Sequence, residues 1–345
     1  MSRWAVVLAG GVGSRFWPVS TPERPKQLLP LATDTPLLRD ALDRMAPLVP
    51  PEQTLILTNA GLIDAIATLA PEIPRANLIA EPRPAGTAAA LAWGAHEVVR
   101  RGGVNAIMLS VHADWAVADG DGFREALTHA ANLAERHRAL ITVGVVPTRP
   151  ESGFGYIQPG EEVEPGARRV ARFVEKPDRA RAEAMVRDGF LWNSGIFVWR
   201  AADFLQELDA HTPEVAPHLR AHAEDLPAFF AAVTTPISVD VGVLERSTRV
   251  MVLPGDFGWD DIGTWAALQR ARQCDANGNA MWGTTHALES SGNVVHAEHG
   301  AVVLYGVSNL VVVSRDGLTL VTTVDKAADL KLLTETLPAS IRELR

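Results

Sequence analysis

The first 145 residues alternate short apolar runs with longer amphipathic stretches, and this alternation limits the folds that the chain can adopt more than any other feature. Because a strand–helix–strand repeat joins neighbouring strands by right-handed crossovers, it predicts a parallel sheet flanked by helices, which binds ligands at the carboxyl ends of its strands. The runs expected to be strands are 4–9, 54–58, 105–110 and 139–146, and the stretches expected to be helices are 36–49, 86–101 and 121–137.

The pattern continues less regularly to about residue 275 and then changes. The middle of the chain predicts strands at 169–175, 192–200 and 249–254 and helices at 179–188, 201–209 and 262–273. Beyond it, short strands alternate with turn signals, of which Asp316-Gly317 is typical of a tight hairpin, and a helix is expected over 326–345. The predicted fold is therefore α/β, a Rossmann-like, mostly parallel sheet flanked by helices over 1–275. A small β-rich C-terminal domain closed by a helix follows over 276–345. The turn signals of that domain are Ser291-Gly292-Asn293, His299-Gly300, Ser308-Asn309 and Asp316-Gly317.

Composition excludes several classes of protein. The formal net charge of -9 argues against binding to nucleic acid, which takes many Lys and Arg contacts on one surface. The single cysteine, Cys274, excludes an intramolecular disulfide framework and indicates a reducing compartment. The opening apolar run ends at Gly10-Gly11, too early for a signal peptide or a membrane span. We therefore expect a cytoplasmic protein that binds neither nucleic acid nor membrane.

Three glycines, Gly10, Gly11 and Gly13, follow the first predicted strand, where a parallel sheet would bind its ligand. Glycines let backbone N–H groups approach a phosphate and form an anion-binding nest. The spacing matches neither the P-loop nor the dinucleotide fingerprint, whose third glycine is replaced here by Phe16. A P-loop NTPase and a dinucleotide-binding oxidoreductase are both disfavoured.

Two cations, Arg15 and Lys26, come directly after these glycines. Arg offers a bidentate fork and Lys a compact charge, and both are suited to phosphate oxygens. Pro18, Pro22 and Pro25 stiffen the segment between them, since each proline fixes its own φ. The stretch therefore predicts a site for a polyphosphate.

These residues resemble the sugar nucleotidyltransferases, and most closely the mannose-1-phosphate guanylyltransferases. The signature of that family is a strand, then Gly-Gly-x-Gly-x-Arg, Trp-Pro and Pro-Lys-Gln, matched here by "LAGGVGSRFWPVS" and "RPKQLLPL". The resemblance covers about residues 4–335, so that 1–275 would be the nucleotidyltransferase catalytic domain. Further matching motifs, in family order, are "EPRPAGTAAA", "PTRPESGFGYIQ", "FVEKPD", "LWNSGIFVW", "ISVDVGVLE" and "FGWDDIGTW".

The resemblance implies transfer of GMP from GTP to mannose 1-phosphate, giving GDP-mannose and pyrophosphate. The attacking phosphate oxygen is already ionised at neutral pH, so the protein needs only to align two polyanions and neutralise charge at the α-phosphorus. This agrees with the absence of a recognisable Ser-His-Asp or Cys-His motif. Mg²⁺ is expected as the cofactor, because two anions must meet.

The resemblance also assigns the nucleotide and metal sites. Arg15 and Lys26 would hold the triphosphate as catalytic residues, and Glu81 would accept the N1–H and exocyclic amine of guanine. Asp114 and Asp261 would bind Mg²⁺, whereas the neighbouring Asp260 is interpreted as a helix N-terminal or surface acid. The nucleotide-binding residues implied are Leu8, Ala9, Gly10, Gly11, Gly13, Ser14, Glu81, Gly86 and Thr87.

The sugar phosphate is assigned to four residues. Lys176 would bind its phosphate as a third catalytic residue, Glu175 and Asn193 would bind the sugar hydroxyls, and Gly155 would allow close backbone approach. Four tryptophans inside the motifs are expected to be packing residues without a catalytic role. They are Trp17, Trp192, Trp259 and Trp265.

The chain departs from the family pattern at two places. His112 precedes Asp114, where the family places a histidine after the aspartate, and Ala85-Gly86-Thr87 replaces Arg-Asn-Thr. The second departure leaves the choice of base open, so a uridylyl- or thymidylyltransferase acting on glucose 1-phosphate remains an alternative. A non-catalytic nucleotide-sugar-binding regulatory subunit is a further alternative, opposed by the presence of all the charged residues. The oligomeric state is open, with a homodimer among the alternatives.

Overall fold

The computed structural model describes residues 2–11 and 13–342, which pack into two compact units. The first unit comprises the chain up to Gly10, Leu42–Ala113 and Asp119–Trp259. The second comprises Gly11–Ala41, Asp114–Ala118 and the chain from Asp260 onward. The glycine-rich segment thus packs with the C-terminal residues, and the domain boundary after residue 275 stays a prediction.

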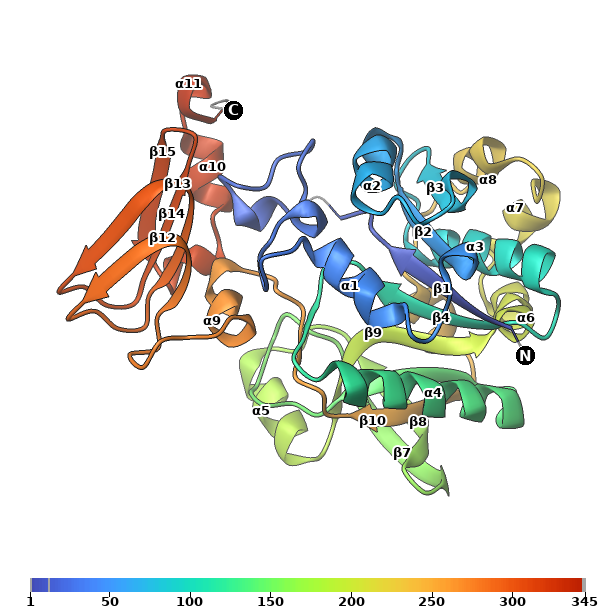
Figure 1. Ribbon diagram of the computed structural model, residues 1–345. Coiled ribbons are helices and arrows are strands. Elements are labelled where there is room, and N and C mark those ends of the chain that lie inside the picture. Colours follow the sequence, from blue (N-terminus) through green and yellow to red (C-terminus); the bar gives the residue numbers. More distant parts are fainter. Residues whose placement is uncertain (1, 12, 343–345) are drawn as a thin grey trace. The chain divides into compact units, whose positions relative to one another are not determined.

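A mixed sheet of nine strands forms the centre of the first unit, in the order β3-β2-β1-β4-β9-β6-β10-β8-β7 (Figure 1). Strands β1 to β4 are parallel to one another, as are β6 and β10. The strands are β1 (Arg3–Leu8), β2 (Thr54–Asn59), β3 (Leu78–Glu81), β4 (Ile107–His112), β6 (Leu140–Val145), β7 (Tyr156–Glu164), β8 (Ala167–Val174), β9 (Leu191–Arg200) and β10 (Val250–Gly255).

Strand β9 is the main departure from the parallel sheet that the sequence predicts. It lies antiparallel between β4 and β6, with Leu109 opposite Val198 and Ile141 opposite the same residue. Strands β7 and β8 form an antiparallel pair, and β8 also pairs antiparallel with β10. The α/β class and the mostly parallel, helix-flanked sheet are confirmed, and β9 brings its first residues to the edge where β4 and β6 end.

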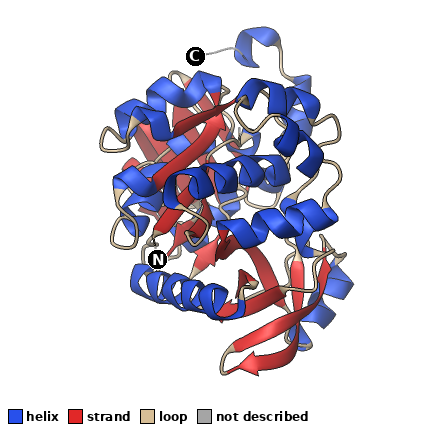
Figure 2. Cartoon of the chain, turned by 90° about the vertical axis from the view of Figure 1, so that its right-hand side faces the viewer, coloured by secondary structure: helices blue, strands red, loops and turns tan. Residues whose placement is uncertain are grey.

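Helices cover the large sheet. Helix α3 packs on β1, β2 and β4 and against α6, while α4 packs on β4, β6, β9 and β10 (Figure 1). Figure 2 shows helices lying across the strands. The helices of this unit are α2 (Ile63–Leu69), α3 (Thr87–Gly102), α4 (Gly120–His137), α5 (Arg179–Arg187), α6 (Ala201–His211), α7 (Ala216–Ala221) and α8 (Leu226–Ala232). Helix α1 (Leu37–Met45) and the short strand β11 (Trp259–Asp260) contribute residues to both units.

The second unit contains the predicted small β structure, a sheet of four strands with the order β12-β13-β14-β15. Strands β12, β13 and β14 are parallel, so the turn signals at Gly292 and Asn309 lie at corners between parallel strands. Strands β14 and β15 form the expected hairpin, in which both Asp316 and Gly317 have positive φ. The elements are β5 (Ala116–Val117), α9 (Leu268–Ala271), β12 (Ala280–Leu288), β13 (Val294–Tyr305), β14 (Leu310–Arg315), β15 (Leu318–Thr323), α10 (Lys331–Thr336) and α11 (Ala339–Arg342).

The closing helix expected over 326–345 is divided. A 3₁₀ turn at Lys326–Ala328 precedes α10, and Leu337 is extended before α11. Pro338 explains the break, because the residue before a proline is disfavoured in the helical region. Across residues 2–11 and 13–342, no helix combines the length and apolarity that crossing a membrane requires.

Candidate active site

The carboxyl edge of the large sheet carries the first group of predicted residues, all within the first unit. Leu8 ends β1, and two hydrogen bonds hold the backbone of Ala9 against β2. The Ala9 N–H donates to the Leu57 carbonyl (2.8 Å), and the Thr58 hydroxyl donates to the Ala9 carbonyl (2.9 Å). Gly10 follows, and a Cβ on it would lie 3.9 Å from Oε1 of Glu81. Glycine here leaves the space above the Glu81 carboxyl open.

Glu81 ends β3, and its carboxyl is perturbed. Burial raises its pKa from 4.5 to about 7. The cause is the loss of hydration on burial, which disfavours the charged carboxylate.

Gly86 and Thr87 begin helix α3 and are tied to the segment before residue 240. Gly86 has a φ of 84°, and a Cβ there would lie 2.3 Å from the Ile237 carbonyl oxygen, so only glycine fits. The Thr87 hydroxyl accepts the backbone N–H of Val239 at 2.9 Å. These residues hold the start of α3 against the segment 237–239, and nucleotide binding by them remains a prediction.

Gly155, Glu175 and Asn193 meet at the same edge of the sheet. The Asn193 N–H donates to the Gly155 carbonyl (2.8 Å), and a Cβ on Gly155 would lie 2.8 Å from Oε2 of Glu175 and 3.4 Å from Cβ of Asn193. The neighbouring Lys176 has a φ of 42° and forms an ion pair with Glu175. Both side chains of this pair are about half exposed or more, which leaves them accessible to a ligand.

Asp240 belongs to this group, although the sequence analysis did not select it. It begins a π-helical turn, Asp240–Leu244, and its Oδ1 accepts Nδ2 of Asn193 at 2.6 Å. Burial raises the pKa of the Asp240 carboxyl; the Asn193 hydrogen bond lowers it, and the charge of Glu175 raises it further. The signal in the sequence was the motif "ISVDVGVLE", which carries Asp240 as its fourth residue. His112, at the end of β4, is close enough to lower that pKa electrostatically.

Lys26 is the centre of the second group, which lies within the second unit. Lys26 is the first residue of a 3₁₀ turn, and its side chain is buried, with only 7% exposed. Nζ donates to the Asp261 carbonyl oxygen at 2.6 Å and pairs with Oδ2 of Asp114 at 3.1 Å. The structure thus brings Lys26, Asp114 and Asp261 together, with the buried ammonium held by both aspartates.

The segment before Lys26 is shaped by Gly13. It has a φ of 67°, and a Cβ there would lie 2.3 Å from Cβ of Lys26, so glycine alone permits this approach. Ser14 and Arg15 follow in a 3₁₀ turn, and Arg15 is exposed. The Ser14 side chain and Val12 lie outside the described residues. Gly11 has open space around its Cβ position.

Asp261 and Asp114 fit the ligand chemistry of Mg²⁺. Burial raises the pKa of the Asp261 carboxyl; Lys26 and Arg15 lower it, and Asp260 and Asp114 raise it. Mg²⁺ is held in many phosphoryl-transfer sites by one or two carboxylates plus substrate phosphates. No cluster of three or more His, Cys, Asp or Glu suited to a metal occurs among the described residues, so the ion would depend on phosphate oxygens for the rest of its shell.

The interpretation of Asp260 as a surface or helix N-terminal acid is wrong. Its side chain is 8% exposed, pairs with Nε of Arg270 at 2.7 Å and accepts the Ile262 N–H at 3.0 Å. Asp260 is thus a buried structural acid. Trp192, Trp259 and Trp265 are buried, as predicted.

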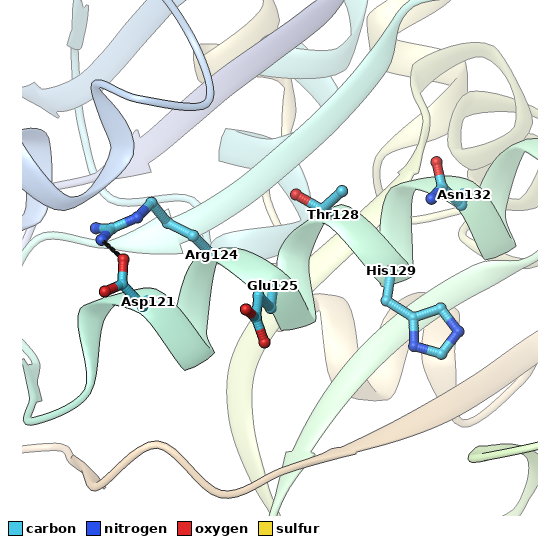
Figure 3. Close-up of a pocket in the computed structure, with 6 residues that line it drawn as sticks. All are labelled: Asp121, Arg124, Glu125, Thr128, His129 and Asn132. Carbon is cyan, nitrogen blue, oxygen red and sulfur yellow. Dashed lines mark hydrogen bonds and ion pairs between the residues drawn. The ribbon is translucent and has the colours of Figure 1, made fainter.

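The first unit also has a hollow along helix α4. Figure 3 shows it lined by side chains of helix α4, with one ion pair between Asp121 and Arg124. None of the predicted site residues lines it, and we assign it no role. Its lining residues are Asp121, Arg124, Glu125, Thr128, His129 and Asn132.

Comparison with known proteins identifies the family. The model of the nucleotidyl transferase family matches residues 4–278. The chain belongs to this family. Mannose-1-phosphate guanylyltransferases of Salmonella muenchen and Escherichia coli K12 are 34% and 35% identical, over 98% of this chain and 74% of each relative. This nucleotidyltransferase is therefore an enzyme of the mannose-1-phosphate guanylyltransferase group.

A crystal structure supports the same assignment. A protein of Thermus thermophilus, described as a mannose-1-phosphate geranyltransferase, superposes on the nucleotidyltransferase with a TM-score of 0.90 at 37% identity. The match covers 97% of this chain and 99% of that one. Both units of the nucleotidyltransferase therefore have counterparts in a solved relative.

Proposed function

We propose that this nucleotidyltransferase transfers GMP from GTP to mannose 1-phosphate, by direct in-line attack of the sugar phosphate on the α-phosphorus. The observation that carries the proposal is the buried Lys26, held between Asp114 and the backbone of Asp261. A fixed cation beside two carboxylates matches a reaction whose main demand is neutralising phosphate charge. No side-chain base is required, because the attacking oxygen is already ionised.

The charged residues are assigned to the phosphate groups and to the metal ion. Arg15 and Lys26 bind the triphosphate, and Lys176 binds the phosphate of the sugar substrate. Asp114 and Asp261 would hold Mg²⁺, which when bound supplies charge neutralisation between the two substrates.

The remaining roles concern the base and the sugar. Glu81 accepts the two donors of guanine, which adenine lacks on that edge. Glu175 and Asn193 bind sugar hydroxyls, with Asp240 fixing the Asn193 amide through its 2.6 Å hydrogen bond. The cytoplasm remains the predicted compartment.

Pyrophosphate release tests the proposal. Purified protein with Mg²⁺ is assayed with GTP, ATP, UTP, CTP and dTTP, each against mannose 1-phosphate and glucose 1-phosphate. Release confined to GTP with mannose 1-phosphate is expected. Preference for UTP or dTTP with glucose 1-phosphate would replace the proposed substrates, and no release with any pair would favour a regulatory subunit. The cofactor is tested by repeating the assay of the preferred substrate pair without Mg²⁺, and with Mn²⁺ or Ca²⁺ in its place. Pyrophosphate release is expected to require a divalent cation.

A further inference from the structure

Glu298, on strand β13, lies at the centre of a buried network in the second unit, far along the chain from the glycine-rich segment. Its side chain is 7% exposed, and Oε2 accepts Nη1 of Arg24 at 2.8 Å. Nε of Arg315 lies 3.7 Å from the same carboxylate and donates to Oδ2 of Asp316 at 3.0 Å. Arg315 in turn donates through Nη1 to the carbonyl oxygens of Pro18 (3.2 Å) and Val19 (3.0 Å).

The two arginines that meet at Glu298 thus hold both halves of the segment between the proposed triphosphate cations. Arg24 stands two positions before Lys26, and Pro18 and Val19 follow Arg15 closely. We propose that Glu298 and Arg315 are positioning residues, which set the Arg15–Lys26 segment for triphosphate binding from the C-terminal β strands. This inference rests on the proposed function and extends it to residues outside the substrate-binding motifs.

Backbone groups of the segment form short turns, such as those of the Val19 and Ser20 N–H groups to the Phe16 carbonyl, and its prolines have no N–H to donate. Side chains from elsewhere in the unit satisfy the next carbonyls. Nε1 of Trp265 donates to the Trp17 carbonyl at 3.1 Å, in addition to the two bonds from Arg315.

A second layer fixes Glu298 itself. Nη2 of the buried Arg272 lies 2.9 Å from Nδ1 of His296, whose Nε2 lies 3.4 Å from Oε1 of Glu298. A guanidinium can only donate, so His296 accepts at Nδ1 and carries its proton on Nε2, directed at Glu298. Burial lowers the pKa of His296, which agrees with a neutral ring, and Trp282 stacks on that ring at 4.4 Å.

The charge of Glu298 is strongly stabilised by these partners. Burial raises its pKa, but the hydrogen bonds from His296 and Arg24 outweigh burial and hold the pKa at about 2. Glu298 is thus a carboxylate at any working pH. Removing its charge leaves Arg24 without the carboxylate that it pairs with and leaves Arg315 with Asp316 alone, and the segment that both arginines hold should loosen.

The test compares Glu298→Gln with Glu289→Gln, an exposed carboxyl of the same unit that serves as the matched control. Hydrogen exchange of the peptides covering 13–29 and 294–323 reports segment order without any substrate. Steady-state kinetics then give KM for GTP and for mannose 1-phosphate separately. Arg315→Lys is the second variant, because it keeps the charge but loses the Nη1 group that donates to the carbonyl oxygens of Pro18 and Val19.

For Glu298→Gln and Arg315→Lys we expect faster exchange confined to 13–29, and kcat/KM for GTP lowered about tenfold or more, since small misplacements are costly in transfer reactions. KM for mannose 1-phosphate and all Glu289→Gln values should stay at the wild-type level. Unchanged exchange over 13–29, or exchange raised equally over 294–323, would overturn the proposal. Wild-type protein that transfers no nucleotide would refute the proposed function instead, and the exchange data would still decide whether Glu298 and Arg315 order the segment.

Discussion

Replacing Glu81 by Gln should stabilise the folded protein while weakening its use of GTP. Burial raises the Glu81 pKa from 4.5 to about 7, so between these pH values the folded chain binds more protons than the unfolded chain. Stability therefore falls as pH rises through this range, and the penalty is complete above pH 7 and absent below about 4.5. Glutamine has nearly the same shape and carries no charge at either pH.

The size of the effect follows from the shift. A difference of one pKa unit corresponds to about 1.4 kcal/mol, so the rise to about 7 corresponds to about 3 kcal/mol of destabilisation at pH 8. We expect Glu81→Gln to unfold at higher urea concentration than wild type at pH 8, by an amount equal to at most about 3 kcal/mol. At pH 4.5 the two proteins should unfold with similar free energies.

Urea unfolding followed by tryptophan fluorescence measures this, at pH values from 4.5 to 8. Glu52→Gln, at an exposed carboxyl of the same unit, is the control for a general effect of removing a negative charge. An equal change in unfolding free energy at pH 4.5 and 8 would refute the reasoning, since a buried carboxyl with a raised pKa cannot behave so. The same variant should raise KM for GTP about tenfold or more, because an amide nitrogen would face a guanine donor.

The other predictions concern further residues of the predicted site and the glycines beside it. Lys26→Ala and Asp261→Asn should each lower kcat/KM for GTP at least about a hundredfold in the pyrophosphate assay with unchanged circular dichroism, and near-normal rates in both would remove them from the site. Asp240→Asn should raise KM for mannose 1-phosphate more than KM for GTP, because its partner Asn193 is assigned to the sugar; equal changes in the two KM values would argue against that assignment. Gly13→Ala should lower the free energy of unfolding in urea by about 1–3 kcal/mol through its positive φ and the Lys26 contact, whereas Gly11→Ala, with open space around it, should not.

The sequence predicted those parts of the fold whose determinants are local. The runs at 54–58 and 139–146 and the Asp316-Gly317 hairpin correspond to observed elements, because strand patterning and turn chemistry act over a few residues. The antiparallel insertion of β9 did not follow from the sequence, since strand order and direction depend on partners far along the chain. Its apolar pattern fits either direction.

The candidate site shows the same division. The family motifs placed Lys26 and Asp261 in one predicted site, and the structure brings them together. Asp260 was given the wrong environment, because its ion pair with Arg270 and its burial arise from tertiary packing. Asp240 was not selected because nothing in the sequence near it indicates its partner. Its role becomes visible only through the 2.6 Å hydrogen bond from Asn193, which lies 47 positions earlier in the chain.

The discontinuous second unit has a consequence for the order in which the protein matures. Arg24 and Glu298 form one ion pair although 274 positions separate them. At translation rates of roughly 5–20 residues per second, the ribosome adds Glu298 on the order of 14–55 s after it has added Arg24. The nascent chain therefore carries its glycine-rich segment for most of its synthesis before Glu298 and Arg315 exist, and the strands made last complete the unit that was begun first.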